Sequence, residues 1–247
     1  MFRLRFSSQT DSTNDDAAAL LGTPGSEGLV LQADYQVAGR GRLGRAWIAP
    51  PGSALLFTAI LPEPISAAAL WCVTFWTALG VAAGIERAAG LRPALQWPND
   101  LLLDGRKCCG ILCVSRIVGA QAWIGCGVGL NVHRPLDDTS LAAIEPPPAF
   151  LSDEVPDVDR ARLLEAILSA LWRSRYLLDD PPNVARGWER RAQLAGTPYR
   201  LRLDGERQTL TGIARRLEDD GSLIIVCDGI ERRVQLADAR VVRDLTP

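Results

Sequence analysis

Lysine is nearly absent from this chain, because Lys107 is the single lysine among its 27 basic residues. Most exposed positions accept either lysine or arginine, so a retained lysine indicates a place that needs a compact ammonium ion rather than a planar guanidinium. Asparagine is also scarce and occurs only at positions 14, 99, 131 and 183. These rare residues are the first candidates for functional roles.

Histidine occurs once, as His133, which excludes metal motifs built on two histidines. The six cysteines lack the regular spacing of a secreted disulfide scaffold, and no two of them form a Cys-x-x-Cys pair. Small buried thiols in a reduced compartment explain them best. We therefore expect no bound metal in the protein itself and a cytoplasmic location.

A large excess of charge is missing too, since the formal net charge is −2 and the sequence pI is about 5.6. Binding to phosphate backbones needs clustered positive charge, so nucleic acid is not the expected main ligand. The N-terminus lacks the apolar core of a signal peptide. Residues 64–85 carry no charge and are long enough to cross a bilayer, but their Ala, Gly and Thr content favours a helix buried against a sheet. We expect no membrane association.

Length and composition predict one dominant domain with an appendage, because 247 residues with 47% hydrophobic content bury a sizeable core. Apolar runs separated by Pro-Asn-Asp, Asp-Gly and Gly turns are typical of hairpins. Strands are expected at 2–6, 28–35, 54–61, 94–97, 101–103, 108–115 and 122–132, and helices at 17–21, 64–85, 159–178 and 183–194. The fold class is α+β, with a mixed, mostly antiparallel sheet and packed helices.

Two further features concern the ends of this pattern. The oxygen-bearing side chains of residues 7–14 are candidates to cap the first helix. After residue 195 the chain changes to short β runs punctuated by three Asp-Gly pairs. Such a segment predicts a small C-terminal β-barrel or SH3-like domain, which divides the chain into 1–195 and 196–247.

The most informative segment is GRGRLGRAW at residues 39–47. Its glycines let the backbone approach an anion closely, and its arginines bind phosphate or carboxylate in bidentate fashion. It matches neither the P-loop nor the dinucleotide fingerprint. Taken alone, it is equally compatible with a phosphate clamp and a nucleic-acid tract.

A second cluster joins WPND at residues 97–100 to KCCGIL at residues 107–112. An Asp-Gly turn at 104 and 105 brings Lys107 back alongside Asn99 and Asp100. A surface salt bridge is the plainer alternative, but the scarcity of lysine and asparagine favours a functional site.

The third element is GVGLNV at residues 127–132, which ends an apolar strand. Glycine within a strand marks a bulge or a close backbone approach, here to a planar ligand, with the Asn131 amide placed to pair with a base edge. Taken alone, a simple bulge is the better explanation of this element.

Together these motifs resemble the biotin protein ligases. The matching segments are DSTN at 11–14, YQVAGRGRLGRAW at 35–47, WPND, Lys107-x-x-Gly110-Ile111-Leu112 and Gly127-x-Gly129-x-Asn131. The resemblance extends to the small β domain through residues 212–223. It implies a class II synthetase-like catalytic domain followed by an SH3-like barrel.

The resemblance also implies the reaction. Biotin and ATP, with Mg²⁺ as cofactor, form biotinyl-5′-AMP, and the biotinyl group then passes to a lysine of a biotin carboxyl carrier protein. Neither step needs an enzyme nucleophile, so the lack of a Ser-His pair is no obstacle. Dimerisation through the central sheet is common in similar ligases, so a homodimer is possible.

Site residues are carried over by motif. The catalytic group is Lys107, Arg42 and Asp100. The biotin-binding group is Ser12, Thr13, Asn14, Gln36, Gly39, Arg40, Lys107 and Gly110. The ATP- and adenylate-binding group is Arg40, Arg42, Arg45, Trp47, Asn99, Lys107 and Asn131.

Two departures from the family pattern are Ala49, where a serine is common, and Val114, where a glutamate is common. Neither removes a group assigned to chemistry. Two alternatives remain: a lipoate ligase, which is not expected to carry the 39–47 motif, and a non-catalytic biotin- or nucleotide-binding module, which could lose Lys107 or Arg42 without harm. Pyrophosphate exchange into ATP, compared for biotin and lipoate, separates all three.

The charge balance generates a first prediction. With no helix-turn-helix before the catalytic segment and no positive net charge, the protein should not bind duplex DNA specifically at physiological salt. Footprinting on candidate operator DNA checks this, and a salt-resistant footprint would contradict it.

Overall fold

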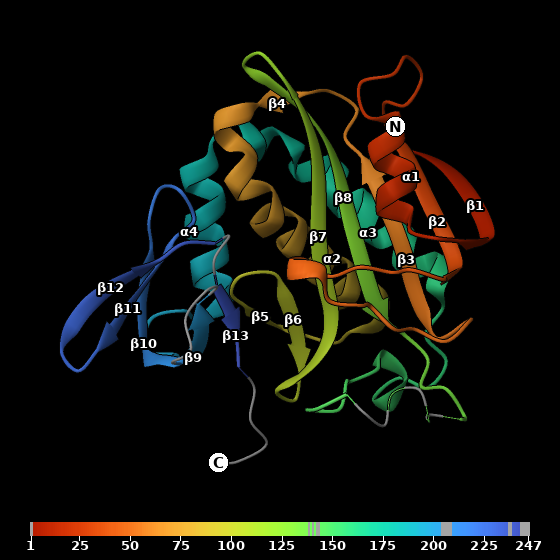
Figure 1. Ribbon diagram of the computed structural model, residues 1–247. Coiled ribbons are helices and arrows are strands. Elements are labelled where there is room, and N and C mark those ends of the chain that lie inside the picture. Colours follow the sequence, from red (N-terminus) through yellow and green to blue (C-terminus); the bar gives the residue numbers. More distant parts are fainter. Residues whose placement is uncertain are drawn as a thin grey trace.

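The computed structural model describes residues 2–137, 139, 141, 144–203, 209–236 and 239–242. Within these residues, an eight-stranded sheet has the order β1-β2-β3-β8-β7-β6-β5, with β4 paired to β8 (Figure 1). The strands are β1 (Arg3–Thr10), β2 (Leu29–Gln36), β3 (Ala54–Ile60), β4 (Ile65–Ser66), β5 (Ala94–Gln96), β6 (Asp100–Leu103), β7 (Arg106–Val118) and β8 (Gln121–Asn131). Among the described pairs of this sheet, β1 with β2 is parallel and the others are antiparallel, which confirms the predicted mixed, mostly antiparallel architecture.

The sheet is covered on both faces. Along β2, Val30 belongs to the large core with α2 (Val73–Ala89) and α3 (Arg160–Ser174), whereas Leu29 and Leu31 pack with Ala17 of α1 (Thr13–Leu20). Because neighbouring residues on a strand point to opposite faces, α1 lies on the face opposite to α2 and α3 (Figure 1). A further helix, α4 (Pro181–Ala192), packs against α2 and β5.

The small residues of α2 have a packing reason. A Cβ on Gly84 would lie 2.4 Å from Cγ1 and 2.7 Å from Cα of Ile167, and one on Gly80 would lie 2.3 Å from Leu171. The glycines therefore let α2 and α3 approach closely. The segment Ala67–Ala89 is long and apolar enough to cross a membrane by length and composition, but 67% of its most apolar window is buried inside the fold. Core packing explains its composition.

A second sheet of five strands, among the described residues, has the order β12-β11-β10-β9-β13. It comprises β9 (Pro198–Leu203), β10 (Thr209–Leu217), β11 (Leu223–Cys227), β12 (Ile230–Val234) and β13 (Ala239–Val241). It is joined to the main sheet at Trp97, whose backbone N–H donates to Tyr199 Oη at 3.1 Å and whose indole Nε1–H donates to the Gly221 carbonyl at 3.2 Å. Of the three predicted Asp-Gly turns, the one at 204 and 205 lies outside the described residues.

Several predicted boundaries need correction. The first helix begins at Thr13 rather than at residue 17, and the side chain of its N-cap Ser12 makes no capping hydrogen bond. The helix expected at 64–85 begins with β4 and a 3₁₀ turn, η2 (Ala67–Cys72), before α2 continues to Ala89. The loop after β2 also contains a short 3₁₀ turn, η1 (Arg42–Gly44). Apolar periodicity marks helices well but does not locate their ends.

The tight contact between α2 and α3 generates a second prediction. Gly84→Ala should destabilise the fold by about 1–3 kcal/mol, because the added methyl group meets the Ile167 backbone, which cannot move independently. The matched control is Gly187→Ala in α4, where the new Cβ would lie 3.7 Å from Cδ1 of Leu79, an ordinary van der Waals contact. That substitution should be neutral or stabilise by up to about 1 kcal/mol through helix propensity. Urea unfolding measures both, and equal midpoints would contradict the packing account.

Candidate active site

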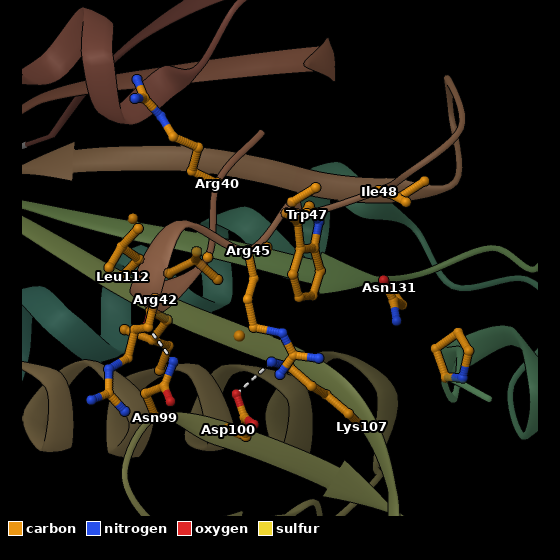
Figure 2. A pocket seen from close by; sticks show the side chains of 18 of the residues that line it. Arg40, Arg42, Arg45, Trp47, Ile48, Asn99, Asp100, Lys107, Leu112 and Asn131 are labelled. Atoms are coloured by element: carbon orange, nitrogen blue, oxygen red, sulfur yellow. Dashed lines mark hydrogen bonds and ion pairs between the residues drawn. The ribbon is translucent and has the colours of Figure 1, made fainter. Parts of the chain in front are cut away.

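A cavity of about 210 Å³ opens between the segment after β2, the β6–β7 hairpin and β8 (Figure 2). It brings together residues from segments that are far apart in the sequence. Gly39 is the one predicted site residue that does not line it, and its role is indirect, since a Cβ there would lie 2.7 Å from the Trp47 carbonyl oxygen. The predicted residues that do line it are Ser12, Thr13, Asn14, Gln36, Arg40, Arg42, Arg45, Trp47, Asn99, Asp100, Lys107, Gly110 and Asn131.

Lys107 and Asp100 form an ion pair at one side of the cavity, with 2.6 Å between Nζ and Oδ1. The β6–β7 turn that places them has φ of 46° at Asp104 and 72° at Gly105, so both turn residues adopt the left-handed conformation that an Asp-Gly hairpin supplies. Asn99 is tied to the same hairpin, because its Nδ2 donates to the Ile111 carbonyl at 2.8 Å. The expectation that the turn returns Lys107 to Asp100 is confirmed.

The three loop arginines point in different directions (Figure 2). Arg40 turns away from the cavity and pairs with Asp15 at the start of α1. Arg42 donates from Nη2 to the carbonyl of Leu236, which follows β12 in the second sheet. Arg45 extends toward Lys107 and Asp100. The loop is therefore anchored to α1 through Arg40 and to the second sheet through Arg42.

Burial affects the electrostatics of this loop. The pKa of the Arg42 guanidinium is lowered by desolvation, and the nearby Asp100 carboxylate partly offsets this effect. A desolvated cation attracts an incoming anion strongly, since little water competes for it. Arg42 is thus a partly desolvated loop arginine that can attract a phosphate strongly.

Trp47 lies flat over glycines of the two central strands. A Cβ on Gly129 would be 2.6 Å from its indole ring, and a Cβ on Gly110 would be 2.9 Å from it. Lys107 Nζ lies 5.4 Å from the ring centroid. The close approach expected near residue 129 is present, and the planar group that packs on this glycine is the protein's own indole. The sequence did not indicate this contact, because it does not show where the distant loop folds back.

The polar end of the cavity is a hydrogen-bonded corner. Gln36 Oε1 accepts from the backbone N–H of Thr13 at 2.8 Å and lies 3.0 Å from its hydroxyl. Asn14 donates from Nδ2 to the Leu112 carbonyl at 2.9 Å. Thr58 of β3 contacts both Thr13 and Asn14 and was not identified from the sequence. The sequence feature that could have identified Thr58 is that it is the single hydroxyl residue in the apolar strand ALLFTAI.

At the opposite end, Asn131 is 6% exposed, and its Nδ2 donates to the Ala149 carbonyl at 3.2 Å. Its carboxamide is therefore partly committed to the protein. The sequence did not identify Leu141, Ile144 and Glu145, which also line this end, because their segment has no periodic pattern.

The cysteines next to Lys107 are not candidate nucleophiles. Burial raises the pKa of the Cys108 thiol to about 12 and that of Cys109 well above its usual value. All six cysteines are free thiols, and five of them are buried. The interpretation of the cysteines as small hydrophobes is confirmed.

Comparison with known proteins agrees with this geometry. The model of the biotin/lipoate A/B protein ligase family matches residues 6–131. The biotin--[acetyl-CoA-carboxylase] ligase of Paracoccus denitrificans is 34% identical over 228 residues, covering 88% of this chain and 91% of that protein. The corresponding ligase of Mycobacterium tuberculosis is 31% identical over 241 residues, covering 90% of this chain and 82% of that protein.

The fold has solved counterparts as well. The structure of the Aquifex aeolicus biotin protein ligase in complex with biotin and ATP has a TM-score of 0.78 and 21% identity, covering 98% of this chain and 99% of that one. The chain belongs to the biotin/lipoate A/B protein ligase family. Its full-length relatives place it among the biotin protein ligases, which confirms the resemblance found in the motifs.

Proposed function

We propose that this protein activates biotin with ATP and transfers the biotinyl group to a lysine of a biotin carboxyl carrier protein. In the first step a biotin carboxylate oxygen bonds to the α-phosphorus of ATP and pyrophosphate leaves. In the second, the carrier amine attacks the acyl carbon and AMP leaves. The observation that carries the proposal is that the single lysine of the chain faces one cavity together with the hydrogen-bonded corner and the loop arginines.

The hydrogen-bonded corner suits the ureido ring of biotin, which offers one carbonyl acceptor and two N–H donors. Gln36 Oε1 is occupied by the Thr13 N–H, so its Nε2 hydrogens are the ones available to a ligand carbonyl. Ser12 lines the cavity, and its side chain makes no capping bond. Ser12, Thr13 and Gln36 therefore supply donors and acceptors in the combination that a cyclic urea needs.

The side of the cavity opposite the hydrogen-bonded corner neutralises negative charge. Two anions, a carboxylate and the α-phosphate, must meet within bonding distance, and fixed cations stabilise the charge that develops there. Lys107 carries a point charge beside Asp100, Arg45 extends toward the same region, and Arg42 is near enough for the Asp100 carboxylate to affect its pKa. Positioning replaces covalent catalysis in this site.

The remaining roles concern the adenylate. Trp47 covers the ligand, Asn131 contacts adenine, and Asn99 lies near the phosphate. Among the described residues no group of three or more His, Cys, Asp or Glu side chains is placed to hold a metal. Mg²⁺ would thus be bound mainly by the ATP phosphates, with Asp100 as the nearest carboxylate, and would neutralise phosphate charge.

Three further expectations follow from the family resemblance. We propose that the second sheet is an SH3-like barrel domain beginning at about residue 196, that the protein works in the cytoplasm, and that it can form a homodimer without specific DNA binding. The domain is supported by its separate sheet and by the contact of its Leu236 with the loop at residues 39–47, called the clamp loop below.

The role of Lys107 generates the third prediction. Lys107→Ala should lower the rate of biotin-dependent pyrophosphate exchange by about 10²–10³, because the carboxylate and the phosphate lose the cation between them. Lys107→Arg should also lower the exchange rate, since a planar guanidinium group does not replace a compact ammonium ion. The control is Arg106→Ala, which removes a neighbouring cation paired with Asp153 outside the cavity. Near-normal exchange by Lys107→Ala, or exchange driven by lipoate instead of biotin, would contradict the assignment.

The clamp loop generates the fourth prediction. Arg42→Gly removes the contact with Leu236 and a buried cation, so it should weaken retention of biotinyl-5′-AMP more than its synthesis. Release of the adenylate after a single turnover and biotinylation of an unrelated bystander protein are measured together. Arg162→Ala, on the exposed surface of α3, serves as control. Equal retention with no stray labelling would show that Arg42 has no clamping role.

A further inference from the structure

Thr58 is a fully buried hydroxyl group in the middle of β3, with no exposed surface. Its neighbours along the strand are apolar, and its side chain points to the face that carries α1. Its Oγ1 lies 2.7 Å from Asn14 Oδ1 and 2.9 Å from Thr13 Oγ1. It does not line the cavity, so it acts on a ligand only through these two residues. A buried hydroxyl is costly unless its hydrogen bonds are made, so its presence here calls for a function.

The protons of this corner have a defined arrangement. Asn14 Nδ2 donates to the Leu112 carbonyl, so the Asn14 carboxamide presents its oxygen to Thr58. That oxygen can only accept, and Thr58 therefore donates its single proton to it. Thr58 Oγ1 is then left as an acceptor for Thr13.

Thr13 is constrained in turn. Its hydroxyl proton has two acceptors inside the protein, Thr58 Oγ1 at 2.9 Å and Gln36 Oε1 at 3.0 Å. With its proton directed inward, Thr13 Oγ1 presents lone pairs to the cavity. A hydroxyl held in this way accepts a hydrogen bond from a ligand N–H and does not need to reorient first.

We propose that Thr58 is a positioning residue that holds Thr13 Oγ1 as a hydrogen-bond acceptor for a ureido N–H and holds Asn14 on the bare backbone of Gly127. The second part rests on the close fit there, since a Cβ on Gly127 would lie 2.1 Å from Asn14 Oδ1. The inference depends on the proposed biotin ligase function and adds a determinant of biotin affinity behind the binding residues.

The test is Thr58→Val, which replaces the hydroxyl by a methyl group of similar size. Asn14 Oδ1 loses its donor and Thr13 loses one acceptor, so the KM for biotin in pyrophosphate exchange should rise by about tenfold or more. The kcat at saturating biotin and the KM for ATP should stay within about twofold, because the groups near the phosphate are untouched. Thr58→Ser keeps the hydroxyl and should restore the KM for biotin.

The matched control is Thr77→Val in α2. Thr77 is equally buried, but its hydroxyl donates to the Val73 carbonyl of its own helix at 2.8 Å. The Thr77→Val substitution should lower the melting temperature of the protein without changing the KM for biotin. If Thr58→Val does not fold at the assay temperature, Thr58→Cys replaces it, because a thiol is a weak donor and should still raise the KM.

Two failures are distinguishable. A wild-type KM for biotin in a folded Thr58→Val or Thr58→Cys protein overturns the positioning role alone. A wild-type protein that shows no biotin-dependent exchange overturns the proposed function itself.

Discussion

The site depends on a patch of sheet that carries no side chains. Gly110 and Gly129 lie opposite each other in the β7–β8 pair, and Gly127 points to the same face as Gly129 because it is two residues away. A Cβ on any of the three would lie within 2.9 Å of Trp47 or Asn14. The indole and the amide therefore rest directly on the backbone, and the floor of the cavity is peptide rather than side chain.

The polar groups and the charged groups lie at different ends of the cavity. Hydroxyl and amide groups gather where α1 begins and meet β3, whereas cations gather where the β6–β7 hairpin turns. A neutral, hydrogen-bonding end and a positive end in one cavity match a ligand that is a cyclic urea at one end and a carboxylate at the other. The loop with Arg42 lies across the positive end and reaches the second sheet through Leu236.

Much of the fold could be predicted because its signals are local. The hairpin that returns Lys107 to Asp100 is encoded by an Asp-Gly pair between two short apolar runs, and the structure has both turn residues at positive φ. Short apolar runs separated by turn residues indicated the strands of the main sheet, and short β runs between Asp-Gly pairs indicated the second sheet. Helix ends were less predictable: Ser12 has the residue type of a helix cap, yet its side chain makes no capping hydrogen bond, and the residue lines the cavity.

By itself the sequence identified the rare lysine, the glycine-arginine loop and the strand glycines as parts of the site, since they are visible as residue types at fixed spacing. Only the tertiary structure decided how they are used. It placed Trp47 on Gly129, where a flat ligand was expected, paired Arg40 with Asp15, and set Thr58 behind Thr13 and Asn14. These contacts join segments tens of residues apart, and packing of the whole sheet and its helices, rather than local spacing, determines which of them meet.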